Sequence, residues 1–237
     1  MDKLSILMPA YNEEKTIHLI LNKIRDCNVS LKKEIIIVDD GSRDNSYEVI
    51  QEYAKNNPEL GIKVFKKENG GKGSAVKYAI KEATGDICIV QDADLEYDPC
   101  DYQACIDPIL NGKTNVVYGS RRLKNNVQYS GLSFFLGGLL VTLVGNILFF
   151  KWITDEPTCY KTFKTDLIKK IPIEGNHFEW EPEVTAKLWR IGETILEVPI
   201  NYYPRTVAEG KHINWKDGVE AVWTFLKWRF KSFKLIN

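Results

Sequence analysis

Short apolar runs alternate with amphipathic stretches along the first half of the chain. The runs lie near 4–8, 34–39, 62–65, 87–90 and 115–118, and most are followed by apolar residues at helical spacing. Runs this short are typical of buried strands, and strands separated by helices pair in parallel through right-handed crossovers. The pattern predicts an α/β fold with a mostly parallel sheet. We expect the first helix to open at Asn12-Glu13-Glu14.

The second half of the chain is less regular. The pattern predicts a short helix over 164–170, a helix over 184–190, a strand over 194–198 and an amphipathic helix over 215–233. Beyond Thr224 the charges of the last helix are all positive and alternate with aromatic residues. This pattern suits an anionic membrane surface. A helix that packs on the core with a solvated basic face explains it equally well.

One segment, 132–150, contains no charged residue and approaches the length of a membrane span. Ser133, Thr142, Asn146 and three glycines within it argue against a true span. We expect either a buried core helix or a helix that lies in the membrane interface. Such an apolar surface could also pair two subunits, so a homo-oligomer is a further possibility.

The amino-acid composition indicates which kinds of binding partner and which cellular compartment to expect. The 237 residues include 32 Lys and Arg and 32 Asp and Glu, so net charge gives no reason to expect nucleic acid as a partner. The five cysteines are scattered and odd in number, as expected for reduced thiols in the cytosol. The N-terminus runs directly into a predicted strand, so no signal peptide is expected. We therefore expect a cytoplasmic protein, associated peripherally with a membrane.

The strongest candidate for chemistry is Asp92-Ala93-Asp94, directly after the apolar run 87–90. Residues two apart on an extended chain project to the same side, and Glu96 continues this alternation. Carboxylates crowded at the carboxyl end of a strand repel one another unless a cation lies between them. Mg²⁺ and Mn²⁺ prefer oxygen ligands, so we expect Asp92, Asp94 and Glu96 to hold one of these metals.

Other polar groups follow the neighbouring strands and would lie at the same edge of the sheet, where open α/β sheets bind ligands. Asp40 could accept hydrogen bonds from a base or ribose, and Tyr11 could stack on the base. Asp40 could instead bind its own turn, and Tyr11 could be a core residue. The glycine loop 70–74 lacks the spacing of a phosphate-binding loop, so we interpret it as a tight turn near the donor.

Five motifs in this order resemble those of the family 2 glycosyltransferases, and most of all the dolichyl-phosphate mannose synthases and related polyprenyl-phosphate glycosyltransferases. The motifs are Pro9-Ala10-Tyr11-Asn12-Glu13, Ile36-Ile37-Val38-Asp39-Asp40-Gly41-Ser42, Gly70-Gly71-Lys72-Gly73, Asp92-Ala93-Asp94-Leu95 and Gly119-Ser120-Arg121. The resemblance implies a single GT-A domain over 1–237, a nucleotide-sugar donor, a divalent metal and inversion at the anomeric carbon. Residues 1–122 would bind the nucleotide sugar, and 123–237 would face the acceptor and the membrane.

The resemblance also assigns roles by position. It places a first group in the nucleoside pocket: Pro9, Tyr11, Glu13, Val38 and Asp40. Asp92 and Ala93 would contact the donor, Asp94 would hold the metal, and Arg121 would approach the sugar or phosphates. Arg205 and Lys211 match a basic pair, six residues apart, that binds the diphosphate or the acceptor phosphate. The family often has glutamine where this chain has Glu96, which leaves the third metal ligand open.

The function implied is the transfer of a hexose from a GDP-mannose or UDP-glucose type of donor to a polyprenyl or dolichyl phosphate at the cytoplasmic membrane face. A metal on Asp94, with Asp92 or Glu96, would neutralise charge on the leaving diphosphate. Arg205 and Lys211 would stabilise the same charge, and a loop over 206–212 could close on the site. A phosphate acceptor needs no base. A hydroxyl acceptor on a glycan would need one, and Glu181 or Glu183 is the candidate, unless both are first-turn helix charges. A third possibility is a non-catalytic, nucleotide-sugar-binding subunit of a membrane assembly.

Overall fold

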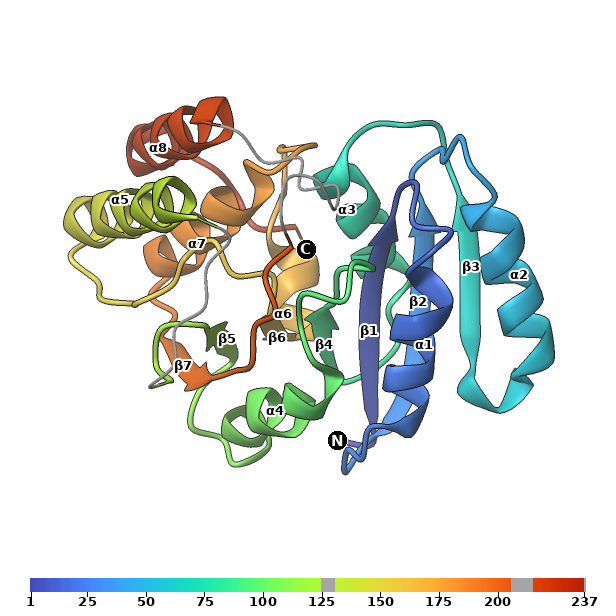
Figure 1. Cartoon of the computed structure of the whole chain (residues 1–237). Coiled ribbons are helices and arrows are strands. Elements are labelled where there is room, and N and C mark those ends of the chain that lie inside the picture. The colour runs from blue at the N-terminus through green and yellow to red at the C-terminus, as the bar shows by residue number, and fades with distance from the viewer. Residues whose placement is uncertain (125–130, 206–214, 237) are drawn as a thin grey trace.

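The computed structural model describes residues 1–124, 131–205 and 215–236, and one seven-stranded sheet runs through it in the order β3-β2-β1-β4-β6-β5-β7 (Figure 1). The strands are β1 (Lys3–Ala10), β2 (Lys32–Asp39), β3 (Ile62–Lys66), β4 (Ile87–Val90), β5 (Val116–Ser120), β6 (Lys161–Lys164) and β7 (Ile195–Pro199). All pairs are parallel except those of β6, which runs antiparallel to β4 and β5. The predicted α/β fold with a mostly parallel sheet is confirmed.

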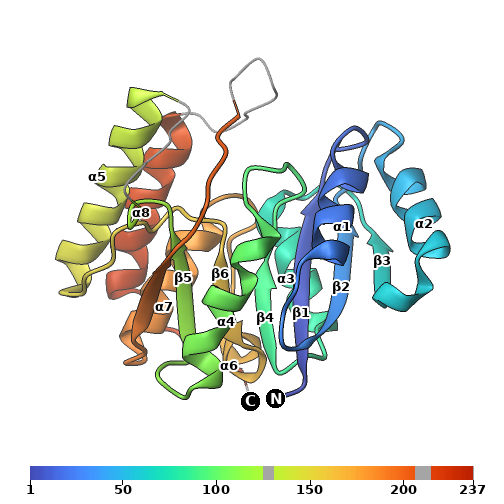
Figure 2. The same cartoon turned by 60° about the horizontal axis from the view of Figure 1, so that its bottom comes forward.

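Helices cover both faces of this sheet (Figure 2). They are α1 (Ile17–Asp26), α2 (Ser46–Asn56), α3 (Lys72–Glu82), α4 (Tyr102–Leu110), α5 (Leu132–Phe149), α6 (Thr165–Lys170), α7 (Trp180–Arg190) and α8 (Trp215–Phe230). β4 is buried along its whole length because helices cover it on both sides. Its carboxyl end therefore delivers Asp92 and Asp94 to the rim of the sheet.

Two sequence predictions about element positions are wrong. The first helix begins at Ile17, because Asn12 has a positive φ of 56° and turns the chain before the helix can start. The strand β6 was not predicted at all. It is only four residues long, and its first residue is Lys161, a residue type that is rarely buried. The Lys161 side chain is fully buried because it lies 3.6 Å from the Glu156 carboxylate and over the Tyr118 ring.

Helices α5 and α8 pack side by side at the end of the molecule farthest from β3 (Figures 1 and 2). Only 28% of the α5 segment is buried, so the expectation of a buried core helix is wrong. Its length and composition would allow it to cross a membrane. The predicted apolar stripe of α8 also faces outward, since Trp223 is 65% and Phe230 is 80% exposed. The buried contacts of α8 come from Phe225 and Trp228.

Candidate functional site

An acidic cluster lies at the carboxyl end of β4, and Asp94 is its centre. One Asp94 oxygen, Oδ2, is 2.7 Å from the Arg205 guanidinium, and the other accepts the Glu96 amide at 3.1 Å. Arg205 also lies 3.6 Å from a Glu13 oxygen. Burial, followed by the negative charges of Asp92 and Glu96, raises the pKa of Asp94 to about 7, against the opposing effect of Arg205. The negative charge of the carboxylates in this cluster is thus greater than the positive charge that Arg205 supplies.

Glu96 lies beside this cluster and shares Arg205 with Asp94, since its Oε1 is 3.7 Å from the Arg205 guanidinium. Its oxygens accept the Tyr202 hydroxyl at 2.8 Å and the Arg205 amide at 2.9 Å. Within 1–124, 131–205 and 215–236, no three acidic, histidine or cysteine side chains converge in a metal-binding arrangement. The structure therefore brings Asp92 and Asp94 to one rim and uses Glu96 to fix the chain that carries Arg205.

Asp92 belongs to a second charge cluster, which sequence reasoning missed. The Lys72 ammonium lies 2.9 Å from Asp92 Oδ2 and 3.2 Å from Glu181 Oε1. Burial alone would lower the pKa of Lys72, but the carboxylates of Asp92 and Glu181 raise it well above its ordinary value. Lys72 opens α3 and Glu181 lies in the first turn of α7, so the cluster joins the two halves of the chain. Glu181 is thereby linked to Asp92 through Lys72, and its role as a base stays a prediction.

Asp40 is buried and organises the glycine loop. Its carboxylate accepts the amides of Gly70 and Gly71 at 3.0 and 2.7 Å and pairs with the Lys67 ammonium. The carboxylate thus binds the glycine loop rather than its own turn, and its contact with a base or ribose stays a prediction. A nucleoside could reach Asp40 only by competing with these partners. Lys67 gave no signal in the sequence because its role depends on the pairing of β2 with β3.

The loops after β1 and β2 are bonded to each other. The amide of Asn12 donates to the Ser42 hydroxyl at 3.0 Å, and that of Glu13 donates to the Ser46 hydroxyl at 2.7 Å. Burial raises the pKa of Glu13, although its hydrogen bond from Thr16 and the charge of Arg205 oppose this shift. These contacts place Glu13 on the same rim as Asp94.

The other residues predicted for the nucleoside pocket differ in accessibility. Tyr11 is 37% exposed, so it is not a core residue and its ring is open to stacking. Val38 is fully buried and pairs with Pro9 in the sheet, and Ala93 is 3% exposed. The side chains of Pro9, Val38 and Ala93 pack within the sheet and at its edge. A donor would therefore contact these three residues mainly through their backbone atoms.

Arg121 is engaged by a buried carboxylate. Its guanidinium makes two 2.7 Å bonds to the two oxygens of Asp155 and a third, at 2.9 Å, to the Pro157 carbonyl. The Tyr202 ring lies under it at 5.0 Å. Bidentate pairs of this kind fix the guanidinium plane, so the structure directs Arg121 to Asp155 rather than into the acidic cluster. Its predicted contact with the sugar stays a prediction.

Glu183, the alternative base, is 1% exposed and fully occupied. It accepts the amides of Glu174 and Gly175 and pairs with Lys187. Glu179 likewise accepts two amides of the preceding loop. Glu179 and Glu183 thus lie at the start of a helix and accept hydrogen bonds from backbone amides. This agrees with the alternative that the acidic residues of this stretch are helix-start charges rather than bases.

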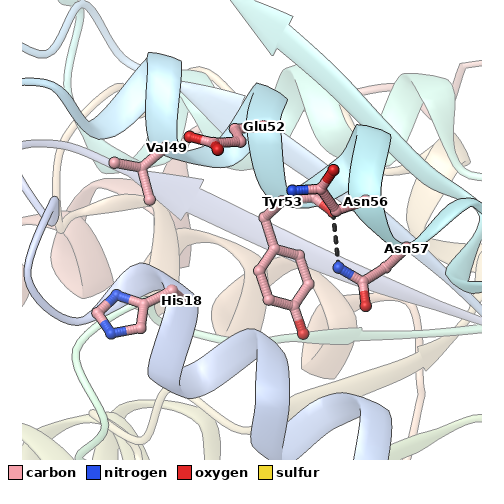
Figure 3. Close-up of a pocket in the computed structure, with 6 residues that line it drawn as sticks. All are labelled: His18, Val49, Glu52, Tyr53, Asn56 and Asn57. Atoms are coloured by element: carbon pink, nitrogen blue, oxygen red, sulfur yellow. Dashed lines mark hydrogen bonds between the residues drawn. The ribbon is translucent and has the colours of Figure 1, made fainter.

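Lys211 and the loop expected to close over 206–212 fall outside the described residues. A surface pocket lies between α1 and α2 and contains none of the predicted site residues (Figure 3). Its lining consists of His18, Val49, Glu52, Tyr53, Asn56 and Asn57.

Comparison with known proteins agrees with this geometry. The family described as Glycosyl transferase family 2 matches residues 5–171. A UDP-N-acetylglucosamine–dolichyl-phosphate N-acetylglucosaminyltransferase of Methanococcus voltae is 29% identical over 228 residues, which cover 88% of this chain and 89% of that protein. A dolichol-phosphate mannosyltransferase of Pyrococcus furiosus is 36% identical over 123 residues, 52% of this chain and only 34% of its own length.

Solved structures show the same fold. The glucosyl-3-phosphoglycerate synthase of Mycobacterium tuberculosis, crystallised with UDP, superposes with a TM-score of 0.73 over 96% of this chain and 80% of that one, at 18% identity. The GT-A fold implied by the five motifs is confirmed, and the family match with relatives named as glycosyltransferases supports an enzyme over the non-catalytic, nucleotide-sugar-binding subunit. The chain therefore belongs to glycosyl transferase family 2 and is a glycosyltransferase.

Proposed function

We propose that this glycosyltransferase transfers a sugar from a nucleotide sugar to a dolichyl or other polyprenyl phosphate, with inversion, at the cytoplasmic surface of a membrane. The observation that carries the proposal is the likeness over 88% of the chain to a protein named for transfer to dolichyl phosphate, together with the acidic rim around Asp94. The donor is of the GDP-mannose or UDP-sugar type.

On the donor side, Asp92 and Asp94 would hold Mg²⁺ or Mn²⁺. The fit rests on the charge of the site, since Asp94 lies among carboxylates that raise its pKa to about 7. Solved relatives of the same fold bind Mn²⁺ together with UDP. When bound, the metal neutralises charge on the leaving diphosphate. Arg205 now pairs with Asp94 and would turn its guanidinium toward that diphosphate, and Tyr11 would stack on the base.

On the acceptor side, the geometry favours an anionic nucleophile. A phosphate oxygen attacks the anomeric carbon without losing a proton, so no general base is needed. Of the two candidate bases, Glu183 is occupied by backbone amides and Lys187, and Glu181 shares its carboxylate with Lys72. This arrangement is unfavourable for activating a hydroxyl.

On the membrane side, α5 and α8 present large apolar side chains beside basic ones. Six residues on these helices or just after α5 are each more than 60% exposed: Leu132, Phe150, Trp152, Trp215, Trp223 and Phe230. Lys227, Arg229 and Lys231 lie in the last turns of α8 and beyond. Apolar anchors next to basic residues are the chemistry of a helix that lies on an anionic lipid surface, where a polyprenyl phosphate would be embedded.

The transfer reaction tests the first part of the proposal. The purified chain would be incubated with radiolabelled UDP-N-acetylglucosamine, UDP-glucose or GDP-mannose, Mn²⁺ and dolichyl phosphate, and the product extracted into organic solvent. We expect label in the organic phase with at least one donor and none after chelation of the metal. Label that stays in water, or that passes to a glycan hydroxyl instead, would contradict the lipid-phosphate acceptor.

Vesicle flotation tests the membrane surface. The wild-type chain should float with anionic phosphatidylglycerol vesicles, and W223S/F230S should not. L19S is the matched control, because Leu19 is 43% exposed on α1, on a different surface. A double variant that floats like wild type contradicts the lipid surface. So does a wild-type dimer that W223S/F230S converts to a monomer, which would make this face a contact between two copies.

A further inference from the structure

Lys72 occupies the junction between the donor edge and the second half of the chain. Its ammonium contacts both Asp92 and Glu181, and the three side chains are only 16%, 19% and 9% exposed. The Phe178 ring lies 5.8 Å from the same ammonium. A cation held between two carboxylates in a nearly buried position restricts both, because neither can turn away without leaving a buried charge unpaired.

The backbone around Lys72 is shaped to hold it there. Gly71 has a φ of +93°, and a Cβ at this position would lie 2.2 Å from the His177 ring. A Cβ on Gly73 would lie 2.8 Å from the His177 carbonyl oxygen. The Ser74 amide donates to the Asn176 carbonyl at 2.9 Å. The glycines are therefore required for close packing of the start of α3 against the loop before α7, rather than for a phosphate.

That loop is itself fixed from the other side. Glu183 and Glu179 accept four of its backbone amides, so both carboxylates flanking Glu181 in sequence anchor the loop. Glu181 alone of these three points to Lys72. The position of Glu181 is thus set by rigid neighbours, and through Lys72 it sets the position of Asp92.

We propose that Lys72 is a positioning residue of the transfer reaction, which with Glu181 orients the Asp92 carboxylate toward the metal and donor site. The inference rests on the proposed function, because it assumes that Asp92 meets a donor. Lys72 occupies Oδ2 of Asp92 and so fixes the direction of the other oxygen. Glu181 then acts as a partner of Lys72 and not as a base. Displacement of a reacting group by about 1 Å is enough to lower rates on the order of 10²-fold.

The test compares K72M, K72R and the control K77M. Lys77 lies on the same helix and ties it to the same loop through the Glu174 carbonyl and the Asn176 side chain, without touching a site carboxylate. For K72M we expect kcat/KM with the donor to fall about 10²-fold, largely through kcat. K72R should recover part of the loss, and K77M should retain wild-type kinetics. Binding of UDP with Mn²⁺ by calorimetry and thermal unfolding complete the comparison.

A double variant separates positioning from direct contact with the substrate. Because Lys72 and Glu181 act as a unit, K72M/E181Q should be no more impaired than K72M, and removal of the second charge should restore folding if K72M unfolds. Losses that multiply, or a K72M enzyme as active as K77M, would overturn the inference while leaving the proposed function intact. A wild-type chain that neither binds UDP with Mn²⁺ nor transfers any sugar would contradict the proposed function itself.

Discussion

Two carboxylates at opposite ends of the same sheet, Glu34 buried and Asp94 partly buried, have pKa values shifted in opposite directions. At the amino end, Glu34 accepts bonds from the Ser5 hydroxyl, from both the amide and the hydroxyl of Thr84, and from the Gly85 amide. Although burial opposes it, these bonds together with Lys63 lower the pKa of Glu34 to about 2. At the carboxyl end, the pKa of Asp94 is raised to about 7.

The difference comes from the partners of each group and not from depth alone. Glu34 meets neutral donors that were aligned by the backbone, and its charge stabilises the fold. Asp94 meets two further carboxylates that Arg205 compensates only in part, so its charge is costly until a metal cation binds. A carboxylate whose negative charge is not balanced by the protein is suited to bind a cationic ligand. A carboxylate whose charge is balanced by hydrogen bonds and a cation instead stabilises the contacts between strands.

Asp94→Asn should have the largest effect on activity. Transfer should fall by about 10²–10³-fold, the size expected when one electrostatic stabiliser of a leaving group is lost. The folded pKa lies above the unfolded value of 3.8, so ionisation of Asp94 lowers stability as pH rises from about 4 to about 7. The variant should therefore unfold at the same or a higher temperature than wild type at pH 7. Scintillation counting of product and calorimetry measure the two effects.

The control for this variant is Asp107→Asn, which removes an exposed carboxylate of α4 that accepts a bond only from Gln103 in the described contacts. Asp107→Asn should leave both transfer and unfolding temperature unchanged. If Asp94→Asn transferred sugar at the wild-type rate, Asp94 would not be a ligand-binding carboxylate, and the contrast with the structural carboxylate Glu34 would be wrong.

Glu34→Gln should have the largest effect on stability. The shift of its pKa from 4.5 to about 2 corresponds to roughly 2–3 kcal/mol at pH 7, an upper bound for the charged form. Because the folded pKa is lowered, this stability is complete above pH 4.5 and is lost as pH falls toward about 2. Urea unfolding of both proteins between pH 7 and pH 2.5 should show a difference that shrinks with acid. A constant difference would mean that the charge of Glu34 is irrelevant.

Arg205→Met should have an intermediate effect. It removes the cation nearest Asp94 and Glu13, and we expect kcat with a saturating donor to fall on the order of tenfold. Mn²⁺ should bind the free variant more tightly than wild type, since no guanidinium competes for Asp94. Electron paramagnetic resonance of Mn²⁺ measures this directly. Weaker metal binding in the variant would show that Arg205 does not compete with the cation.

Lys63→Met should have the smallest effect. Lys63 lies 3.0 Å from Glu34, but its side chain is 40% exposed, and exposed ion pairs contribute about 0–1 kcal/mol. We expect a change in the free energy of unfolding within this range by urea titration. A loss as large as that in Glu34→Gln would show that the ion pair, and not the hydrogen bonds, holds the amino end together.

The alternation of apolar runs and helical spacing was enough to predict the sheet, most of its strands and the edge that carries Asp92 and Asp94. These features depend on local pattern, because a short buried strand must be apolar along its whole length. The motifs at the strand ends likewise predicted the family. The apolar length of α5 was visible in the sequence, but its exposure was not.

Sequence alone determined which side chains stand at the carboxyl edge, since strand direction and spacing fix that. Only the tertiary structure decided how their charges are paired. Lys72 meets Glu181 across 109 residues, and Arg205 meets Asp94 across 111. In β6, Lys161 can likewise be buried because a carboxylate and a ring surround its ammonium. Charge compensation over such separations depends on distances in space, and no local pattern of residues encodes them.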